Sequence, residues 1–276
     1  GPNYGQTESH HKINTRCLKT MCLITFAYNV HPSYRLILAA NRDEFYDRPS
    51  SSADFWNDHP DVLAGRDLKN GGTWLGITKN GKFSAVTNYR DPSTLKSGAP
   101  SRGKLARDYL TGHHNIANYL QKISAKADQY NGFNLLLGDD NDAFVFSSRG
   151  EKQKLKPGIY GLSNHLLNSP WPKVVRSRRM LKAALEKKGD DLEGALFDLL
   201  ADRRVPPDDK LPSTGIGLEW ERLLSSIFIE SPIYGTRSST VVLIGKNRRI
   251  RFVEKVFDGQ KEPWITSRFS FVLKRK

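Results

Sequence analysis

The chain has 276 residues, 38% of them hydrophobic and 26% charged, with a formal net charge of +14 and two cysteines, Cys17 and Cys22. A chain of this size can bury a large core, yet no apolar run approaches the roughly 20 residues of a membrane-spanning helix. Two cysteines argue against a disulfide framework or a metal site, and the absence of helix-turn-helix, RNP-type, zinc-finger and long basic motifs argues against a nucleic-acid partner despite the charge.

Residues 1–20 look foreign to a folded domain. They are polar, they have no hydrophobic period, and Gly1-Pro2 resembles the scar that a tag protease leaves. We therefore expect residues 1–20 to be a tag-derived or disordered extension, and residues 21–276 to form a single domain.

Strands are predicted over most of the first ninety residues of that domain. Asn80-Gly81 is a strong hairpin signal, and Gly71 and Gly72 permit a close approach of another backbone segment. The stretch 41–56 is polar and contains Pro49, so we expect a loop there. The predicted strands are 23–28, 34–40, 71–77 and 82–87.

Helices are predicted in the middle of the chain and strands at its end. Ser101 is a candidate cap for the first helix, and Pro172 suits the first turn of the third. The helices are 103–110, 116–127, 172–188 and 192–200, and the strands are 133–137, 143–146, 159–162, 240–244, 250–256 and 266–273, with a Pro-rich loop over 203–217. Antiparallel hairpins rather than βαβ repeats dominate, so the sequence predicts an α+β layered domain.

The third predicted helix carries the densest basic cluster of the chain. A solvated helix face explains the cluster most simply, and a surface for an acyl-coenzyme A or an anionic lipid is the other interpretation. Its members are Lys173, Arg176, Arg178, Arg179, Lys182, Lys187 and Lys188.

Cys22 stands at the head of the first apolar strand, directly after Met21. In such a strand a cysteine can simply be a small buried hydrophobe. If Met21 were removed to leave Cys22 as the first residue, its free amine, with a pKa of roughly 7.7–8.0, would lie beside its own thiol. One residue would then supply both nucleophile and base. An uncleaved extension would turn that amine into an amide and abolish the base.

Polar residues follow three later apolar strands. Arg42 and Asp43 end the strand expected to pair with that of Cys22, where Arg42 can hold a thiolate or a carboxylate and Asp43 can orient the amine. Asn88 and Asn164 end two further strands, where an amide N–H is a suitable oxyanion donor, although turn residues also occupy such places. Arg237 precedes a buried strand. These residues predict a shared pocket.

The motifs taken together resemble the transport and Golgi organisation (NRDE-motif) family, from residue 21 to the C-terminus. They are Met-Cys at 21–22, Leu-Ala-Ala-Asn-Arg-Asp-Glu-Phe at 38–45 with Arg-Pro at 48–49, Gly-Gly-Thr-Trp-Leu-Gly at 71–76, Thr-Asn-Tyr at 87–89, Tyr-Asn-Gly-Phe-Asn-Leu at 130–135, Tyr-Gly-Leu-Ser-Asn at 160–164 and Tyr-Gly-Thr-Arg at 234–237. The resemblance implies a four-layer αββα sandwich of two antiparallel sheets, as in N-terminal nucleophile hydrolases. It also implies the hydrolase-like set Cys22, Arg42, Asp43, Asn88, Asn164 and Arg237.

The function implied by the resemblance is intracellular haem binding and trafficking, in the cytoplasm, with mitochondrial association as the other placement considered. Arginines and asparagines around a cleft, with Arg42 and Arg237 among them, would hold the propionates. Cys22 or His165 would ligate the iron; the pair His113-His114 is the alternative, although an exposed loop explains it more simply. No Cys-x-x-Cys-His motif exists, so the haem, or another small anionic ligand, would be bound non-covalently. The alternative is an N-terminal cysteine amidohydrolase or acyltransferase, and the sequence leaves the choice open.

Overall fold

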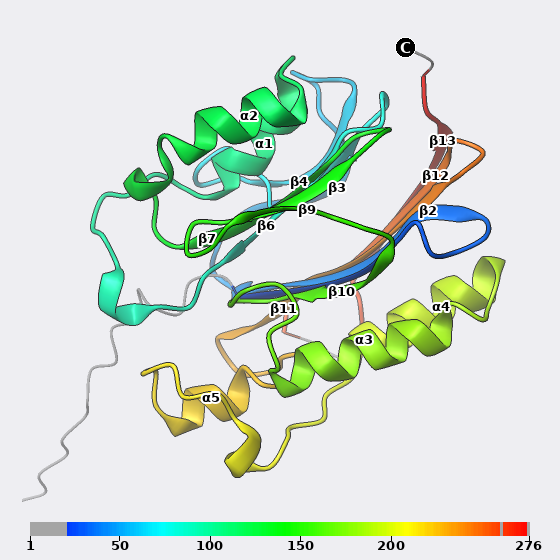
Figure 1. The fold of residues 1–276 in the computed structure, drawn as a ribbon. Coiled ribbons are helices and arrows are strands. Elements are labelled where there is room, and N and C mark those ends of the chain that lie inside the picture. Colours follow the sequence, from blue (N-terminus) through cyan, green and yellow to red (C-terminus); the bar gives the residue numbers. More distant parts are fainter. Residues whose placement is uncertain (1–20, 260–261, 275–276) are drawn as a thin grey trace, which may run out of the picture.

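The structure, a computed structural model, describes residues 21–259 and 262–274. Two antiparallel sheets stack face to face, and helices cover the outer face of each (Figure 1). Helices α1 (Gly103–Thr111) and α2 (Ile116–Ser124) lie over one sheet, and α3 (Pro172–Ala184) and α4 (Gly189–Leu200) lie under the other. The predicted αββα layer order is therefore confirmed.

The six-stranded sheet brings the two ends of the described chain together. Its strand order is β10-β1-β2-β11-β12-β13, so β2 from the start of the domain pairs with β11 from its end. The strands are β1 (Met21–Tyr28), β2 (Tyr34–Phe45), β10 (Gly158–Leu162), β11 (Tyr234–Gly245), β12 (Arg249–Val256) and β13 (Ile265–Val272).

The seven-stranded sheet is a meander in chain order, from β3 to β9. Helices α1 and α2 are inserted between its fourth and fifth strands. The strands are β3 (Ser50–Phe55), β4 (Val62–Asp67), β5 (Leu75–Thr78), β6 (Phe83–Asn88), β7 (Phe133–Gly138), β8 (Ala143–Ser147) and β9 (Lys152–Lys154). The predicted Asn80-Gly81 hairpin turn joins β5 to β6, with Gly81 at a φ of 91°.

Strand β1 is apolar on both faces because it lies in the middle of the sandwich. Ile24 and Phe26 face the other sheet, whereas Leu23 and Ala27 face α3 and α4. Burial of each larger side chain contributes roughly 1.5–3 kcal/mol to stability. This double burial fixes the register of β1 and thereby places Cys22 on the face between the sheets.

Several predicted boundaries were wrong. The stretch 41–56 is not a loop, because β2 continues to Phe45 and β3 begins at Ser50. Strand β4 and the short helix α5 (Leu218–Leu223) were not predicted, and Gly71 (φ 67°) lies in a turn before β5. Ser101 does not cap α1, whose N-cap is Arg102 without a side-chain bond.

Candidate functional site

Cys22 and Arg42 lie directly opposite each other in the β1–β2 ladder. Opposite residues of an antiparallel pair point to the same face, and here that face is the space between the sheets. The thiol is completely buried. Burial raises the pKa of Cys22 to about 12, the Asp43 carboxylate acts in the same direction and Arg42 opposes both. In this state Cys22 is a neutral thiol.

Asp43 points to the opposite face, toward the helix layer, as alternation along a strand requires. Its Oδ1 accepts a hydrogen bond from the Thr236 hydroxyl at 2.7 Å, and its buried Oδ2 has no hydrogen-bond partner among the described residues. Burial raises the pKa of Asp43 to about 7, and the positive charge of Lys173 opposes this rise.

Lys173 was expected on a solvated helix face, and that expectation was wrong. The side chain is 2% exposed beneath the six-stranded sheet, and its Nζ donates to the Leu224 carbonyl at 2.9 Å. Burial lowers the pKa of Lys173 to about 8, which the charge of Asp43 partly offsets. Asp43 and Lys173 therefore form an interior charge system behind the Cys22 strand.

Asn41, the first residue of the Asn-Arg-Asp-Glu motif, is a structural link. Its buried amide donates to the Leu200 and Ile227 carbonyls, both at 2.9 Å, and its Oδ1 accepts from the Ser239 hydroxyl at 2.7 Å. One side chain thus joins β2, β11, the end of α4 and the segment before β11.

Asn88 and Asn164 lie together at the ends of β6 and β10. The Asn164 amide donates to the Asn88 carbonyl at 2.9 Å, and the Asn164 carbonyl accepts from the Arg90 N–H at 2.7 Å. The neighbouring Ser163 hydroxyl donates to the Cys22 carbonyl at 2.9 Å. These bonds tie the two sheets together beside Cys22.

Arg237 occupies an irregular position of β11. The register against β2 shifts between Thr236 and Ser238, so Arg237 lies at a β-bulge, which redirects its side chain. Its Nη1 donates to the carbonyls of Phe45, Tyr46 and Arg48 at 2.8, 3.0 and 3.2 Å. Arg237 therefore holds the connection between β2 and β3.

His165 directly follows Asn164, and its side chain lies in an aromatic cluster outside the cavity lining. Its half-buried ring contacts Tyr89 and Trp171, with ring centroids 5.0 and 5.5 Å away. Burial, together with the charge of Arg90, lowers the pKa of His165. This environment favours a neutral imidazole in an aromatic cluster.

A cavity of about 710 Å³ opens between the two sheets and the segment 95–103. Of the predicted residues, Arg42, Asn88 and Arg237 line it, whereas Cys22, Asp43, Asn164 and His165 do not. The structure thus brings three of the predicted residues to the cavity wall and places the rest behind it or elsewhere. The charged lining residues are Arg42, Arg48, Arg66, Lys96, Arg102 and Arg237, with the acids Asp67 and Glu254.

Sequence reasoning missed Arg102, which precedes α1. Its Nη1 donates to the Gly132 carbonyl at 3.0 Å. Burial lowers the pKa of Arg102 to about 10, and the negative charge of Glu44 opposes this fall. An arginine that directly precedes a predicted helix gives no signal, in a single sequence, that it lines a cavity.

Sequence reasoning also missed Glu254 on β12. It is 3% exposed, accepts from the Ala53 N–H at 2.6 Å and from the Thr240 hydroxyl at 3.3 Å, and burial raises its pKa. The available signal was a carboxylate at an inward position of a strand: Glu254 continues the alternation of Ile250 and Phe252, and acids are rarely buried without partners.

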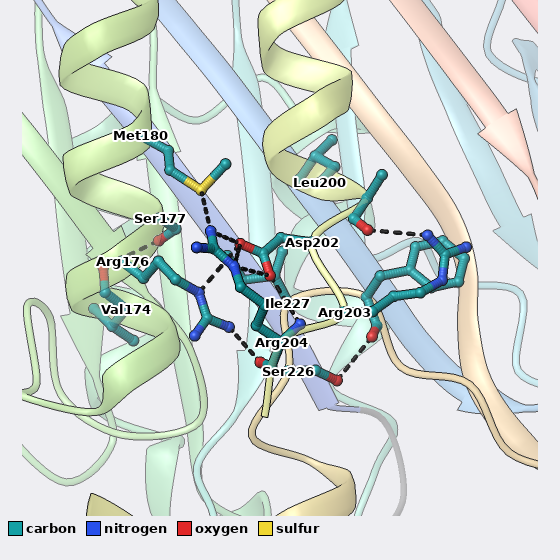
Figure 2. A network of polar contacts seen from close by, with 12 residues as sticks. Val174, Arg176, Ser177, Met180, Leu200, Asp202, Arg203, Arg204, Ser226 and Ile227 are labelled. Carbon is teal, nitrogen blue, oxygen red and sulfur yellow. Dashed lines mark hydrogen bonds and ion pairs between the residues drawn. The ribbon is translucent and has the colours of Figure 1, made fainter. Parts of the chain in front are cut away.

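The basic helix α3 is partly neutralised by its neighbours. Figure 2 shows Arg176 and Arg204 around Asp202, with the Arg176 ion pair at 3.3 Å. Arg176 also donates to the Arg204 carbonyl at 2.6 Å, and Arg178 donates to the Ile159 carbonyl at 3.3 Å. These two arginines stabilise the helix layer.

Two absences hold within residues 21–259 and 262–274. No group of three or more His, Cys, Asp or Glu side chains there is arranged to hold a metal ion. No helix in these ranges combines the length and apolar character needed to cross a membrane.

Comparisons with known proteins agree on a family. The family model described as Transport and Golgi organisation 2 matches residues 21–259. The Transport and Golgi organization protein 2 homolog of Bos taurus is 39% identical over 275 residues, covering 92% of this chain and 99% of that protein. The Homo sapiens homolog is 38% identical with the same coverage, and the Drosophila melanogaster protein is 30% identical over 87% of this chain.

Among solved structures, the Caenorhabditis elegans N-acylethanolamine-hydrolyzing acid amidase ortholog matches with a TM-score of 0.48 and 12% identity, covering 80% of this chain and 92% of that one. The family match covers β1 to β12, and it includes the Asn-Arg-Asp-Glu segment of β2 and the Tyr-Gly-Thr-Arg segment of β11. The chain therefore belongs to the Transport and Golgi organisation 2 family.

Proposed function

We propose that this protein binds haem non-covalently in the cavity between its sheets and carries it through the cytoplasm. The observation that supports this most is the excess of arginine in a cavity of about 710 Å³. Haem carries two propionates, and guanidinium groups bind carboxylates through two parallel hydrogen bonds. A cationic wall suits a dianionic cargo.

The size and the apolar walls of the cavity suit a flat, largely apolar ligand. Small-molecule sites commonly enclose roughly 300–1,000 Å³ and combine apolar walls with a few polar groups. Trp74, Val86, Val256 and Ile265 supply apolar wall here. Trp264 also lines the cavity and is 62% exposed, which makes its ring available to a ligand at the rim.

The proposal relies on the carboxylates of the haem rather than on its iron. Within the described ranges, the residues lining the cavity include no His, Cys, Met or Tyr, and neither Cys22 nor His165 is among them. Iron-free protoporphyrin IX should therefore bind about as tightly as haem. Recognition through the acid groups also keeps the cargo releasable, as trafficking requires.

Absorbance titration tests the proposal directly. Haem added to the purified protein should give a saturable change of the Soret band, and protoporphyrin IX should compete with it. The matched ligand is haem dimethyl ester, which lacks both negative charges and should bind far more weakly. A Soret absorbance that rises linearly with added haem, without saturation, contradicts the proposal.

The opposition of Cys22 and Arg42 across the ladder supports a second candidate, a cysteine amidohydrolase. This activity needs Cys22 as the first residue, so that its amine is the base. Intact-mass analysis of the protein from its natural source tests the requirement, and an electrophilic lactone should then label Cys22 stoichiometrically. Retention of any residue before Cys22 excludes this mechanism.

A further inference from the structure

We propose that Arg42 and Arg102 form a two-sided clamp for the acidic group of the ligand, a carboxylate or a phosphate. The inference rests on the proposed use of the cavity for an anionic ligand, and it assigns the charged contact to two of its six cationic residues. Arg42 belongs to the six-stranded sheet, and Arg102 approaches from the side of the seven-stranded sheet.

Arg42 has a guanidinium that is buried, cavity-facing and nearly unpartnered. The residue is 8% exposed and lines the cavity. Among the described residues its guanidinium makes no hydrogen bond, and its ion pair with Glu44 spans 4.0 Å. A buried cation normally requires close acceptors. Its N–H groups are therefore available to an anion.

Arg102 meets the same space with most of its guanidinium unused. Its hydrogen bond to the Gly132 carbonyl engages Nη1, and its guanidinium has no ion pair among the described residues. Arg102 lines the same cavity as Arg42, from the segment that leads into α1. Arg42 and Arg102 thus meet one cavity from the six-stranded sheet and from the start of α1.

Two other cavity arginines are engaged elsewhere. Arg48 pairs with Asp67 at 2.7 Å and with Glu44 at 3.5 Å. Arg237 donates to three backbone carbonyls through Nη1. Their loss would disturb the β2–β3 connection, whereas loss of the clamp residues would remove ligand contacts.

A pair of glycines positions Arg102. A Cβ on Gly72 would lie 2.6 Å from the carbonyl carbon of Gly103, the first residue of α1, and the Thr73 N–H donates to the Gly103 carbonyl at 3.2 Å. The predicted close approach at Gly71-Gly72 is thus the contact that fixes the start of α1. Gly72→Ala should displace the α1 start and with it Arg102.

Binding measurements on Arg42→Gln and Arg102→Gln test the clamp, with Arg179→Gln as the control. Arg179 is an exposed residue of α3, so its variant makes the same charge change away from the cavity. A charge-assisted hydrogen bond contributes roughly 1.5–3 kcal/mol, which corresponds to about a tenfold to hundredfold loss of affinity. The affinity for haem should fall by this factor in each clamp variant and should stay unchanged in Arg179→Gln.

Two probes separate the clamp from the haem proposal. The second probe is 8-anilinonaphthalene-1-sulfonate, an amphipathic anion whose fluorescence reports binding, and circular dichroism verifies that each variant is folded. If haem binds the clamp variants as tightly as Arg179→Gln, the clamp is refuted and haem binding stands. If only the sulfonate binds, and the clamp variants lose it, haem is refuted and the clamp stands. If neither probe binds the parent protein, both are refuted.

Discussion

The buried ion pair between Arg90 and Glu221 permits a quantitative prediction. The Arg90 Nη1 lies 2.8 Å from the Glu221 Oε2, and both side chains are at most 5% exposed. The Glu221 Oε1 accepts two bonds from Thr214, at 2.7 Å from its N–H and 2.6 Å from its hydroxyl. Arg90 also lies over the Trp171 ring, 4.7 Å from its centroid. Helix α5 is thereby tied to the segment beyond β6.

Glu221→Ala leaves the Arg90 charge buried without its carboxylate. Removing one partner of such a pair typically costs about 3–5 kcal/mol, which corresponds to a fall of roughly 6–20 °C in Tm for a chain of this size. Glu221→Gln should cost less, because an amide oxygen can still accept from Thr214. The Arg90→Met/Glu221→Leu double variant should be less destabilised than Glu221→Ala, since neither charge remains.

Urea unfolding followed by circular dichroism measures these differences, with an unchanged slope as the sign that the unfolded states are comparable. A loss below about 1 kcal/mol for Glu221→Ala, the level of exposed pairs, would refute the buried-pair reasoning. So would a double variant whose loss equals the sum of its single-variant losses, because the two effects would then be independent.

Three further predictions use other features. Gly76→Ala should lower the free energy of unfolding in urea by about 1–3 kcal/mol, because the new Cβ would lie 2.7 Å from the Cβ of Ala64. Gly194→Ala lies in open space on α4 and should raise the free energy of unfolding. Equal effects of the two substitutions would contradict this reasoning. Between pH 3.8 and about 7, Asp43 keeps a proton in the folded state that it loses in the unfolded state, so the unfolding free energy falls as pH rises. Asp43→Asn removes this group and should make that fall less steep. An unchanged slope of unfolding free energy against pH would contradict the prediction. Burial raises the pKa of Cys22 from 9.0 to about 12, so the folded protein should react with iodoacetamide at Cys22 at least about a thousandfold more slowly than the protein unfolded in urea. Peptide mapping by mass spectrometry measures both rates. Equal rates would contradict the burial of the thiol.

The αββα layer order was predictable because the motifs of the chain, in their order, resemble those of a family with that fold. The length of β2 was not predictable. Asn41 and Asp43 look like loop residues in the sequence, and a loop was predicted from residue 41 onward. Their partners, Ser239 and Thr236, lie almost two hundred residues away. Only the pairing of β2 with β11 gives these polar side chains buried partners, so local sequence could not predict the strand.

The candidate site was predictable only in part, because some of its residues are placed by contacts between distant segments of the chain. Arg42, Asn88 and Arg237 reach the cavity wall, as their positions at strand ends suggested. Arg102 reaches it because α1 packs on Gly72, a contact between two distant backbone segments. Lys173 matched the pattern of a basic helix face, yet its side chain is buried and donates to the Leu224 carbonyl. Periodicity cannot distinguish a solvated lysine from one that has a buried acid nearby.

The buried amide of Asn41 makes the helix layer and the sheet dependent on one another. Its donors hold the Leu200 and Ile227 carbonyls and its acceptor holds Ser239. The end of α4 therefore cannot fray without breaking its bond to a side chain that also links β2 and β11. Segments linked in this way open as one cooperative unit, and their amide protons exchange with solvent at a shared rate. The part of the six-stranded sheet that carries Asn41 and Ser239 should consequently open together with the end of α4.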